Sequence, residues 1–299
     1  MKSIVSYEER GSGGRSSYRG NCSPRLITDI ASFLGINEIA DYMCGSNTTK
    51  DAAEQLGIES HCYDLNMGFD LMHDDIPERP EAIFFHPPYW SIIGYAGHQY
   101  DADAIIKKYG FDPRKNDLSR QQPWEDFLKE LNFCILKQFA ALEKGGHFAI
   151  LVGDIKKKGL LYSMLVDMIK PGTLKQIVIK AQHNVWSDNV AYTGQKFIPI
   201  AHEYMILLQK DNALIYPIKL TKNSRIDVRD AQSVTWRDVV ASVLEEMNGK
   251  VSLDALYNAI DGHRRTETNK DWRAKIRQTL QAYPDTFHNV ERGVWSLAA

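Results

Sequence analysis

The chain has 299 residues, of which 43% are hydrophobic and 25% are charged, so it can bury a substantial core and long disorder is not expected. Its formal net charge of −2 excludes binding to nucleic acid through bulk positive charge alone, so any basic surface must be local. The scattered cysteines argue against a zinc site and a disulfide scaffold, and no uncharged apolar run approaches the ~18 residues of a membrane span. We therefore expect a soluble, cytoplasmic protein with no metal and no membrane partner.

The N-terminal region is predicted to be a flexible segment followed by a helix. Residues 1–17 are expected to be flexible, because Glu9 to Ser17 are rich in glycine, serine and charge. Ser23 is a suitable cap for a helix with Pro24 at its first position, and apolar residues follow at helical spacing as far as Gly35.

The next elements are two strands that each end in an unusual turn. We predict a strand over 36–43, a tight turn over 44–49 and a helix over 50–56. A second apolar strand, over 81–85, ends in two prolines, which cannot continue a central strand. Residues 91–122 are irregular and long for a connection, so we expect a loop that faces a substrate.

The second half of this region repeats the alternation of helix and strand. An amphipathic helix is predicted from Trp124 to Phe139, and strands over 147–152, 174–180 and 204–209. This order predicts an α/β fold with a mostly parallel, doubly wound, Rossmann-like sheet over residues 18–220. Ligands of such sheets bind at the carboxyl ends of the strands, where both unusual turns fall.

The last part of the chain is predicted to be a separate small domain. A polar linker covers 221–232, and helices are predicted over 236–247, 252–260 and 271–283, with a closing strand over 291–297. Three short helices and a strand indicate a winged helix-turn-helix domain over 233–299.

The third of these helices is expected to present a basic face to DNA. Trp272, Ile276 and Leu280 recur every four residues, which leaves Arg273 and Arg277 facing elsewhere. Further basic candidates for DNA contacts lie close in sequence: Arg264, Arg265 and Lys270. The alternative is an ordinary solvated face on a small packing domain.

The turn over 44–49 is a candidate cofactor site. Gly45 would let backbone N–H groups approach a ligand, and Asp41 and Asp64 are candidate carboxylates at strand ends, where a carboxylate can bind a pair of ribose hydroxyls. An ordinary strand-to-helix connection would look similar, so this signal alone is weak.

The turn after the second strand has a more specific composition. In His86-Pro87-Pro88-Tyr89, two prolines fix the backbone while an aromatic side chain follows outside the sheet. The carbonyl of Pro87 can accept an N–H from the exocyclic amine of a flipped base, and Tyr89 can stack on its ring. Trp90, directly after this turn, is a further candidate for contact with DNA.

Together these motifs resemble those of the amino-methyltransferase family of DNA methylases. The resemblance rests on Gly20 to Leu26, Asp41 to Thr49, His86 to Trp90 and His202 to Ile206, and covers roughly residues 18 to 210. It implies S-adenosylmethionine as methyl donor, double-stranded DNA as substrate and no metal. It also implies further cofactor-binding residues: Asn21, Ser23, Pro24, Asn47, Thr48 and Thr49.

One residue departs from the family pattern. The family usually has Asp, Asn or Ser where this chain has His86, although a neutral imidazole can accept a hydrogen bond through its unprotonated nitrogen. We expect methylation at N6 of adenine. N4 of cytosine, an amino group in RNA or protein, and a non-catalytic DNA-binding regulator are the alternatives. Selectivity for a DNA sequence can also lie in residues 91–122 or 182–198. The sequence allows a homodimer.

Overall fold

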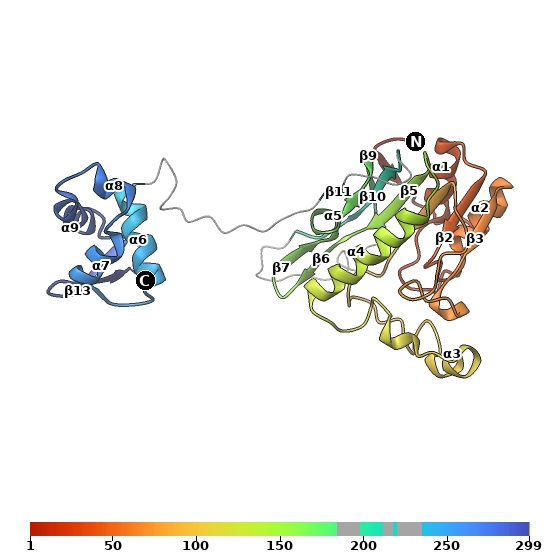
Figure 1. Ribbon diagram of the computed structural model, residues 1–299, viewed down its shortest axis with the longest axis horizontal. Helices are drawn as coiled ribbons and strands as arrows, with labels where there is room; N and C mark the ends of the chain where they lie inside the picture. The colour runs from red at the N-terminus through yellow and green to blue at the C-terminus, as the bar shows by residue number, and fades with distance from the viewer. Residues whose placement is uncertain (184–197, 212–217, 220–234, 299) are drawn as a thin grey trace. The chain divides into compact units, whose positions relative to one another are not determined.

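The computed structural model describes residues 1–183, 198–211, 218–219 and 235–298. It contains two compact units, Met1–Thr221 and Lys222–Ala299 (Figure 1). The linker predicted over 221–232 lies outside the described residues. Each unit is therefore described by itself.

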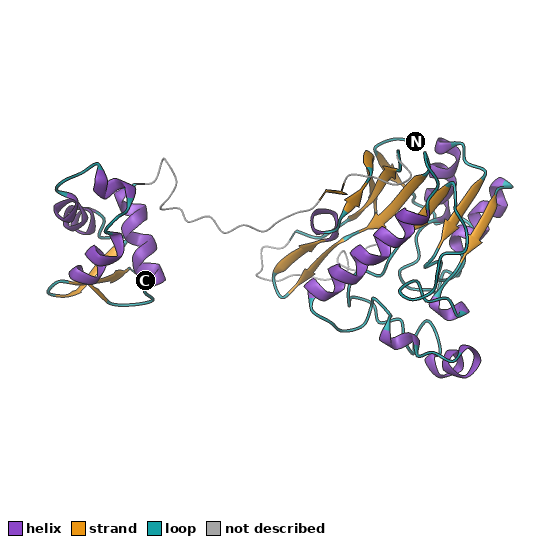
Figure 2. Ribbon diagram, viewed as in Figure 1, coloured by secondary structure: helices purple, strands orange, loops and turns teal. Residues whose placement is uncertain are grey.

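The first unit has a mixed α/β fold around a seven-stranded sheet (Figure 2). Its strands are β1 (Ile4–Ser6), β2 (Glu38–Asp41), β3 (Glu59–Cys62), β4 (Ala82–Phe85), β5 (His147–Val152), β9 (Thr173–Ala181) and β10 (His202–Gln209). The strand order is β1-β9-β10-β5-β4-β2-β3. Strand β10 is antiparallel to β5 and to β9, whereas the other neighbouring pairs are parallel. The predicted, mainly parallel sheet is thus confirmed.

Helices pack on both faces of this sheet because its central strands are apolar on both sides. Along β5, Phe148 and Ile150 point into one core cluster, and Ala149 and Leu151 point into another. The first cluster includes the apolar residues of α4, and the second includes those of α1 and α2. A strand buried on both faces is typical of a doubly wound sheet.

The helices of this unit are α1 (Pro24–Leu34), α2 (Thr48–Leu56), α3 (Ala102–Tyr109), α4 (Trp124–Ala141) and α5 (Met164–Asp167), with 3-10 turns η1 (Leu65–Met67) and η2 (Pro113–Lys115). The boundaries of α1 match the prediction at Pro24 and Gly35, although the Ser23 side chain does not cap the helix. Pro24 occupies the first turn of α1, and Gly35 ends it with φ 65°. Among the described residues, no helix has the length and apolar character needed to cross a membrane.

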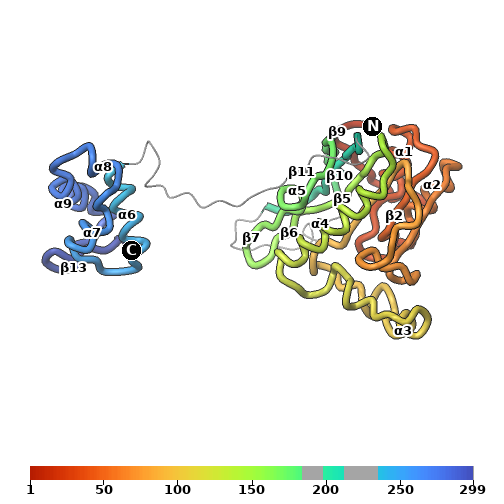
Figure 3. Tube along the Cα trace, in the orientation of Figure 1, coloured from red at the N-terminus to blue at the C-terminus, as the bar shows by residue number. Residues whose placement is uncertain are grey.

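The N-terminal segment has contacts that its composition does not predict. Strand β1 forms one edge of the sheet and pairs in parallel with β9, and the chain's N-terminus lies near β9 in Figure 3. The backbone N–H of Gly14 donates to Asp51 Oδ2 at 2.7 Å, and Ser23 Oγ donates to the carbonyl of Arg10 at 2.7 Å. The flexible segment expected over 1–17 is therefore wrong for β1, and the following residues are hydrogen-bonded to the first two helices.

Several short elements also differ from the prediction. The segment 91–122 is not wholly irregular, since it contains α3 and η2. Strand β3 was not predicted. The same holds for the antiparallel hairpin of β6 (Asp154–Lys157) and β7 (Leu160–Ser163), and for the pair β8 (Lys170–Pro171) and β11 (Ile218–Lys219).

The second unit has its own apolar core. Its elements are α6 (Trp236–Glu246), β12 (Val251–Ser252), α7 (Leu253–Ile260), α8 (Arg264–Glu267), α9 (Trp272–Ala282), β13 (Phe287–Glu291) and β14 (Val294–Leu297). The three strands form a sheet in the order β12-β14-β13, so the single closing strand expected over 291–297 is one arm of a hairpin. Ile276 and Leu280 of α9 are buried in the core with residues of α6 and α7, as their spacing predicted.

Candidate functional site

A pocket of about 840 Å³, including its open mouth, is lined by residues at the carboxyl ends of β2 and β4 and just beyond β3. Residues of both predicted turns line this one pocket. The predicted site residues that line it are Asn21, Asp41, Gly45, Thr48, Thr49, Asp64, His86 and Pro88. These residues lie far apart in the sequence, and the crossover helices of the sheet bring them together.

Asp41, the last residue of β2, is hydrogen-bonded to residues at both ends of the turn over 44–49. The side chain is buried, with Oδ2 accepting from Thr49 Oγ1 at 2.5 Å and Oδ1 accepting from the Met43 N–H at 3.1 Å. Burial raises the pKa of Asp41 to about 7, although both hydrogen bonds oppose the shift. A cation in this pocket would favour the ionised carboxylate.

Asp64 holds the glycine turn in place. Its Oδ2 accepts from the Gly45 N–H at 2.9 Å, and its Oδ1 accepts from the Asn66 N–H at 3.0 Å. The Asn66 side chain in turn donates to the carbonyl of Gly45 at 3.2 Å. Burial raises the pKa of Asp64 despite these bonds. Gly45 is in the left-handed region with φ 53°, and an added Cβ would meet the Tyr18 ring at 2.9 Å.

The start of α1 closes another side of the pocket. Asn21 Nδ2 donates to Ser46 Oγ at 2.8 Å, and Thr48 Oγ1 donates to Asn21 Oδ1. Gly14, with φ 62°, lies so close to these side chains that an added Cβ would overlap Thr48 Oγ1. The N-terminal segment therefore packs directly on the turn over 44–49.

Three residues that the resemblance assigns to the cofactor do not line this pocket. Ser23 Oγ donates to the Arg10 carbonyl, Pro24 is buried in the first turn of α1, and Asn47 precedes α2 with φ 67°. Asn47 lines a neighbouring hollow with Gly14 and Asp51. These three residues shape the turns next to the pocket.

The proline turn presents His86 and Pro88 to the same pocket. Pro87 between them is buried, and Tyr89 is half-buried outside the pocket lining. Tyr89 packs against Gly153, where an added Cβ would lie 2.8 Å from its ring. The Tyr89 ring is thus packed against its neighbours in the protein. Its expected stacking on a base stays a prediction.

The hydroxyl of Tyr89 joins His86 to a buried ion pair. It donates to Glu203 Oε1 at 2.7 Å and lies 3.0 Å from His86 Nε2. Glu203 Oε2 accepts from Lys180 Nζ at 2.6 Å. Burial lowers the pKa of His86 to about 4, so its imidazole is neutral at pH 7. Burial alone would raise the pKa of Glu203, but Lys180 and His86 bring it below the usual range.

Trp90 does not have the role predicted for it. Its side chain is only 6% exposed, its Nε1 donates to the Gln122 carbonyl at 2.7 Å, and it packs against Trp124 and Tyr162. The backbone at Trp90 has φ 48°, so the chain turns sharply after Tyr89. A side chain buried in this aromatic cluster is not available to contact DNA, so that prediction is wrong.

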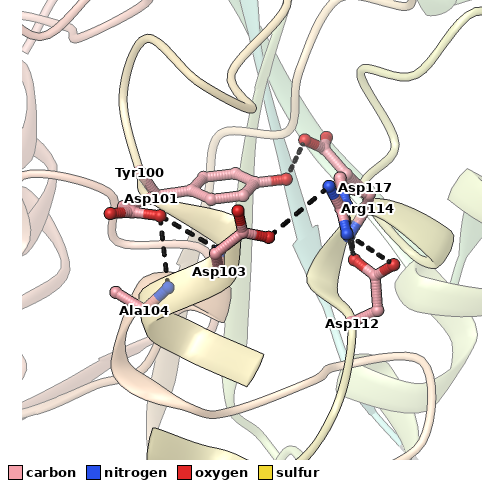
Figure 4. A network of polar contacts seen from close by, with 7 residues as sticks. All are labelled: Tyr100, Asp101, Asp103, Ala104, Asp112, Arg114 and Asp117. Carbon is pink, nitrogen blue, oxygen red and sulfur yellow. Dashed lines mark hydrogen bonds and ion pairs between the residues drawn. The ribbon is translucent and has the colours of Figure 1, made fainter. Parts of the chain in front are cut away.

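The pocket also has a wall that the motifs did not predict. Tyr95, Tyr100, Asn116, Asp117 and Leu118 of the segment 91–122 line it. Tyr100 donates to Asp117 Oδ2 at 2.6 Å, and nearby Arg114 pairs with Asp112 at 2.8 Å (Figure 4). The aromatic and acidic composition of this segment was a sign in the sequence that it lines a site. It did not indicate which of its residues face the pocket.

The chemistry of the pocket suits a cationic ligand with an apolar part. Four carboxyl side chains line it: Asp41, Asp64, Asp70 and Asp117. Phe69, Leu71 and Leu118 add apolar surface. Within the described part of the chain, no group of three or more potential ligands has the arrangement of a metal site.

The second unit places most of the predicted basic residues at its surface. Arg264, Lys270, Arg273 and Arg277 are exposed, whereas Arg265 is half-buried with its guanidinium 6.0 Å from the Trp236 ring. Arg277 donates to the Tyr257 hydroxyl at 2.8 Å, and Arg273 lies over the rings of Tyr257 and Trp272. Trp186, Asn189 and Tyr192 of the other predicted recognition segment lie outside the described residues.

Comparison with known proteins gives matches only among solved structures. No protein-family model matches the chain, and no curated protein matches it significantly. The chain is similar to TehB from Haemophilus influenzae, with 11% identity and a TM-score of 0.34 over 62% of each chain. It is similar to a candidate class I S-adenosylmethionine-dependent methyltransferase from Listeria monocytogenes, with 12% identity and a TM-score of 0.34 over 71% of this chain and 66% of that one.

A third similar structure is a candidate DNA modification methylase from Thermus thermophilus, complexed with S-adenosylmethionine. The identity is 18% and the TM-score 0.28, over 61% of this chain and 59% of that one. The chain thus spans less than two thirds of the length of each of these three structures. Similarity at this level is too low to establish an activity or a ligand.

Proposed function

We propose that the chain is an S-adenosylmethionine-dependent methyltransferase that acts on an amino group of a base in DNA, with N6 of adenine as the expected target. One observation carries the proposal. Residues of the predicted cofactor turn and of the His86-Pro87-Pro88 turn line a single pocket. A methyl donor and an amine would therefore meet within it.

The pocket residues fit this cofactor in chemical type. The four carboxyl groups favour a sulfonium cation, and carboxylates at strand ends such as Asp64 are suited to a pair of ribose hydroxyls. Phe69 and Leu71 offer apolar surface for a flat ring. When bound, S-adenosylmethionine supplies an electrophilic methyl group on sulfur.

The proline turn would then orient the amine. A carbonyl fixed by Pro87 and Pro88 can accept one N–H, and the neutral His86 ring can accept the other. Two acceptors hold the nitrogen lone pair in one direction, which is the positioning that a displacement reaction needs. The chain's contribution is therefore orientation and acceptance of the proton that the amine loses.

The substrate class is tested by transfer of a labelled methyl group. The purified chain and labelled S-adenosylmethionine are incubated in three separate reactions, with duplex DNA, with RNA or with a protein extract. We expect label in DNA only. Label in RNA or protein alone would overturn the proposed substrate while leaving methyl transfer intact.

The second unit is proposed to bind double-stranded DNA as a winged helix-turn-helix domain. Its element order of helix, strand, three helices and a two-stranded hairpin supports this, as do the exposed arginines of α9. Arg273 and Arg277 are the proposed contacts from α9, with Arg264 and Lys270 nearby. Arg265 is a weaker candidate because it is half-buried.

Deletion of residues 233–299 is expected to weaken binding to duplex DNA about 10-fold or more, because each lost phosphate contact also reduces counterion release. Fluorescence anisotropy with a labelled duplex measures this at two salt concentrations. The salt dependence should become shallower in the truncated chain. Cofactor binding is the control and should not change. Unchanged DNA affinity would contradict a DNA-binding role for this unit.

A further inference from the structure

The ion pair beneath the proline turn is unusual because it is buried and linked to the pocket. Lys180 and Glu203 are cross-strand partners on β9 and β10, with side chains 11% and 8% exposed. A buried pair adds little stability compared with apolar residues, so its presence calls for another reason. Here Glu203 also accepts a hydrogen bond from the Tyr89 hydroxyl, and the same hydroxyl contacts His86.

The direction of these hydrogen bonds determines which nitrogen of His86 carries its proton. A tyrosine hydroxyl has one hydrogen, and Tyr89 donates it to Glu203 Oε1 at 2.7 Å. The contact of 3.0 Å between His86 Nε2 and the Tyr89 oxygen must then have Nε2 as the donor. A neutral ring with a proton on Nε2 has an unprotonated Nδ1.

His86 lines the pocket, and its Nε2 makes the hydrogen bond to Tyr89. We propose that Glu203 and Lys180 are positioning residues that hold His86 in the Nε2–H tautomer, so that Nδ1 accepts first a hydrogen bond and then a proton from the substrate amine. The inference rests on the proposed function. It explains how an imidazole can stand where a carboxylate or amide oxygen is usual.

The step balances without any further reactant. The amine nitrogen forms a bond to the methyl carbon while the carbon–sulfur bond breaks and leaves its electron pair on sulfur. The proton leaves the nitrogen for His86 Nδ1. The resulting imidazolium is stabilised by Glu203 through Tyr89, and its Nδ1 proton then passes to solvent.

The tautomer is tested directly in the full chain, without substrate, by nitrogen-15 NMR of labelled histidine rings. The His86→Asn variant identifies the His86 signals by their loss. We expect Nε2 protonated and Nδ1 unprotonated at pH 7, and a mixture of tautomers in Glu203→Gln, whose amide can donate to Tyr89. A proton on Nδ1 in the native chain, or no change in Glu203→Gln, would overturn the inference.

Kinetics separate a positioning role from a merely structural one. Glu203→Gln is expected to lower kcat about 10- to 100-fold with little change in KM for S-adenosylmethionine. His86→Asn should keep measurable activity, because its amide oxygen can still accept a hydrogen bond from the amine. An amide has no tautomer for Glu203 to select, so adding Glu203→Gln to this variant should change kcat less than about 3-fold. Equal losses in both backgrounds would contradict the assigned roles, and the tautomer measurement tests the inference however active the His86→Asn enzyme is.

Two further variants make the test robust. Glu38→Gln is the matched control, since Glu38 also lies on a central strand and pairs with His61, and it should leave kcat unchanged. If the unpaired Lys180 prevents Glu203→Gln from folding, Lys180→Met with Glu203→Gln removes both charges together. A native chain that shows the expected tautomer but transfers no methyl group would refute the proposed function and not the tautomer.

Discussion

Replacement of Asp64 by alanine is expected to weaken binding of S-adenosylmethionine at least about 100-fold, or ~2.7 kcal/mol. The loss has two sources. The carboxylate is the proposed ligand of the ribose hydroxyls, and it also accepts the backbone N–H groups of Gly45 and Asn66. Removing it would leave two part-buried donors without this acceptor and release the turn that lines the pocket. Isothermal titration calorimetry measures the effect.

Asp103→Ala is the matched control for this variant. Asp103 is an exposed carboxylate on α3 whose ion pair with Arg114 has a separation of 3.8 Å, so its removal should change affinity less than about 2-fold. Asp64→Asn, which keeps one oxygen acceptor, should fall between the two. Native affinity in Asp64→Ala would show that the pocket does not hold the cofactor in the proposed way.

Replacement of Gly172 by alanine is expected to destabilise the first unit by about 3 kcal/mol or more. Gly172 joins β8 to β9 in the left-handed region, with φ 76°. An added Cβ would lie 2.5 Å from the carbonyl oxygen of Gln209 and overlap the Phe139 ring. Neither neighbour can yield easily, because one is backbone of a central strand and the other is a fully buried ring on α4. Urea unfolding followed by circular dichroism measures the change.

Gly159→Ala isolates the contribution of the backbone alone. Gly159 lies in the β6–β7 turn with φ 78°, and an added Cβ would meet nothing within 4 Å. Its cost should be only about 1 kcal/mol, the usual penalty for alanine in this region. Similar losses in the two variants would mean that the close packing around Gly172 is not what restricts this position.

Local signals in the sequence were sufficient for α1 and for the inner strands of the sheet. Helix α1 was predictable from Pro24 and Gly35, and β5 from its continuous apolar run. Strand β3 was not, because Glu59–Cys62 is an edge strand of half-exposed residues without apolar alternation. Helix α3 has only two buried residues, so its periodicity was too weak to predict a helix in a polar segment.

The candidate site was predictable where it lies at strand ends. Asp41, Asp64 and His86 follow or end strands, so the fold class alone brings them to one edge of the sheet. The aspartates Asp70 and Asp117 lie in turns whose orientation depends on packing between distant segments. The Lys180–Glu203 pair depends on the register between β9 and β10, which the two strand sequences do not specify separately.

The most direct test of the central claim is nucleoside analysis of duplex DNA after incubation with the purified chain and S-adenosylmethionine. Mass spectrometry distinguishes N6-methyladenine from N4-methylcytosine. We predict N6-methyladenine, which would show that His86 can replace the usual Asp. N4-methylcytosine would correct the target base. No methylated nucleoside, with S-adenosylmethionine still bound, would contradict the proposal that this pocket transfers a methyl group to DNA.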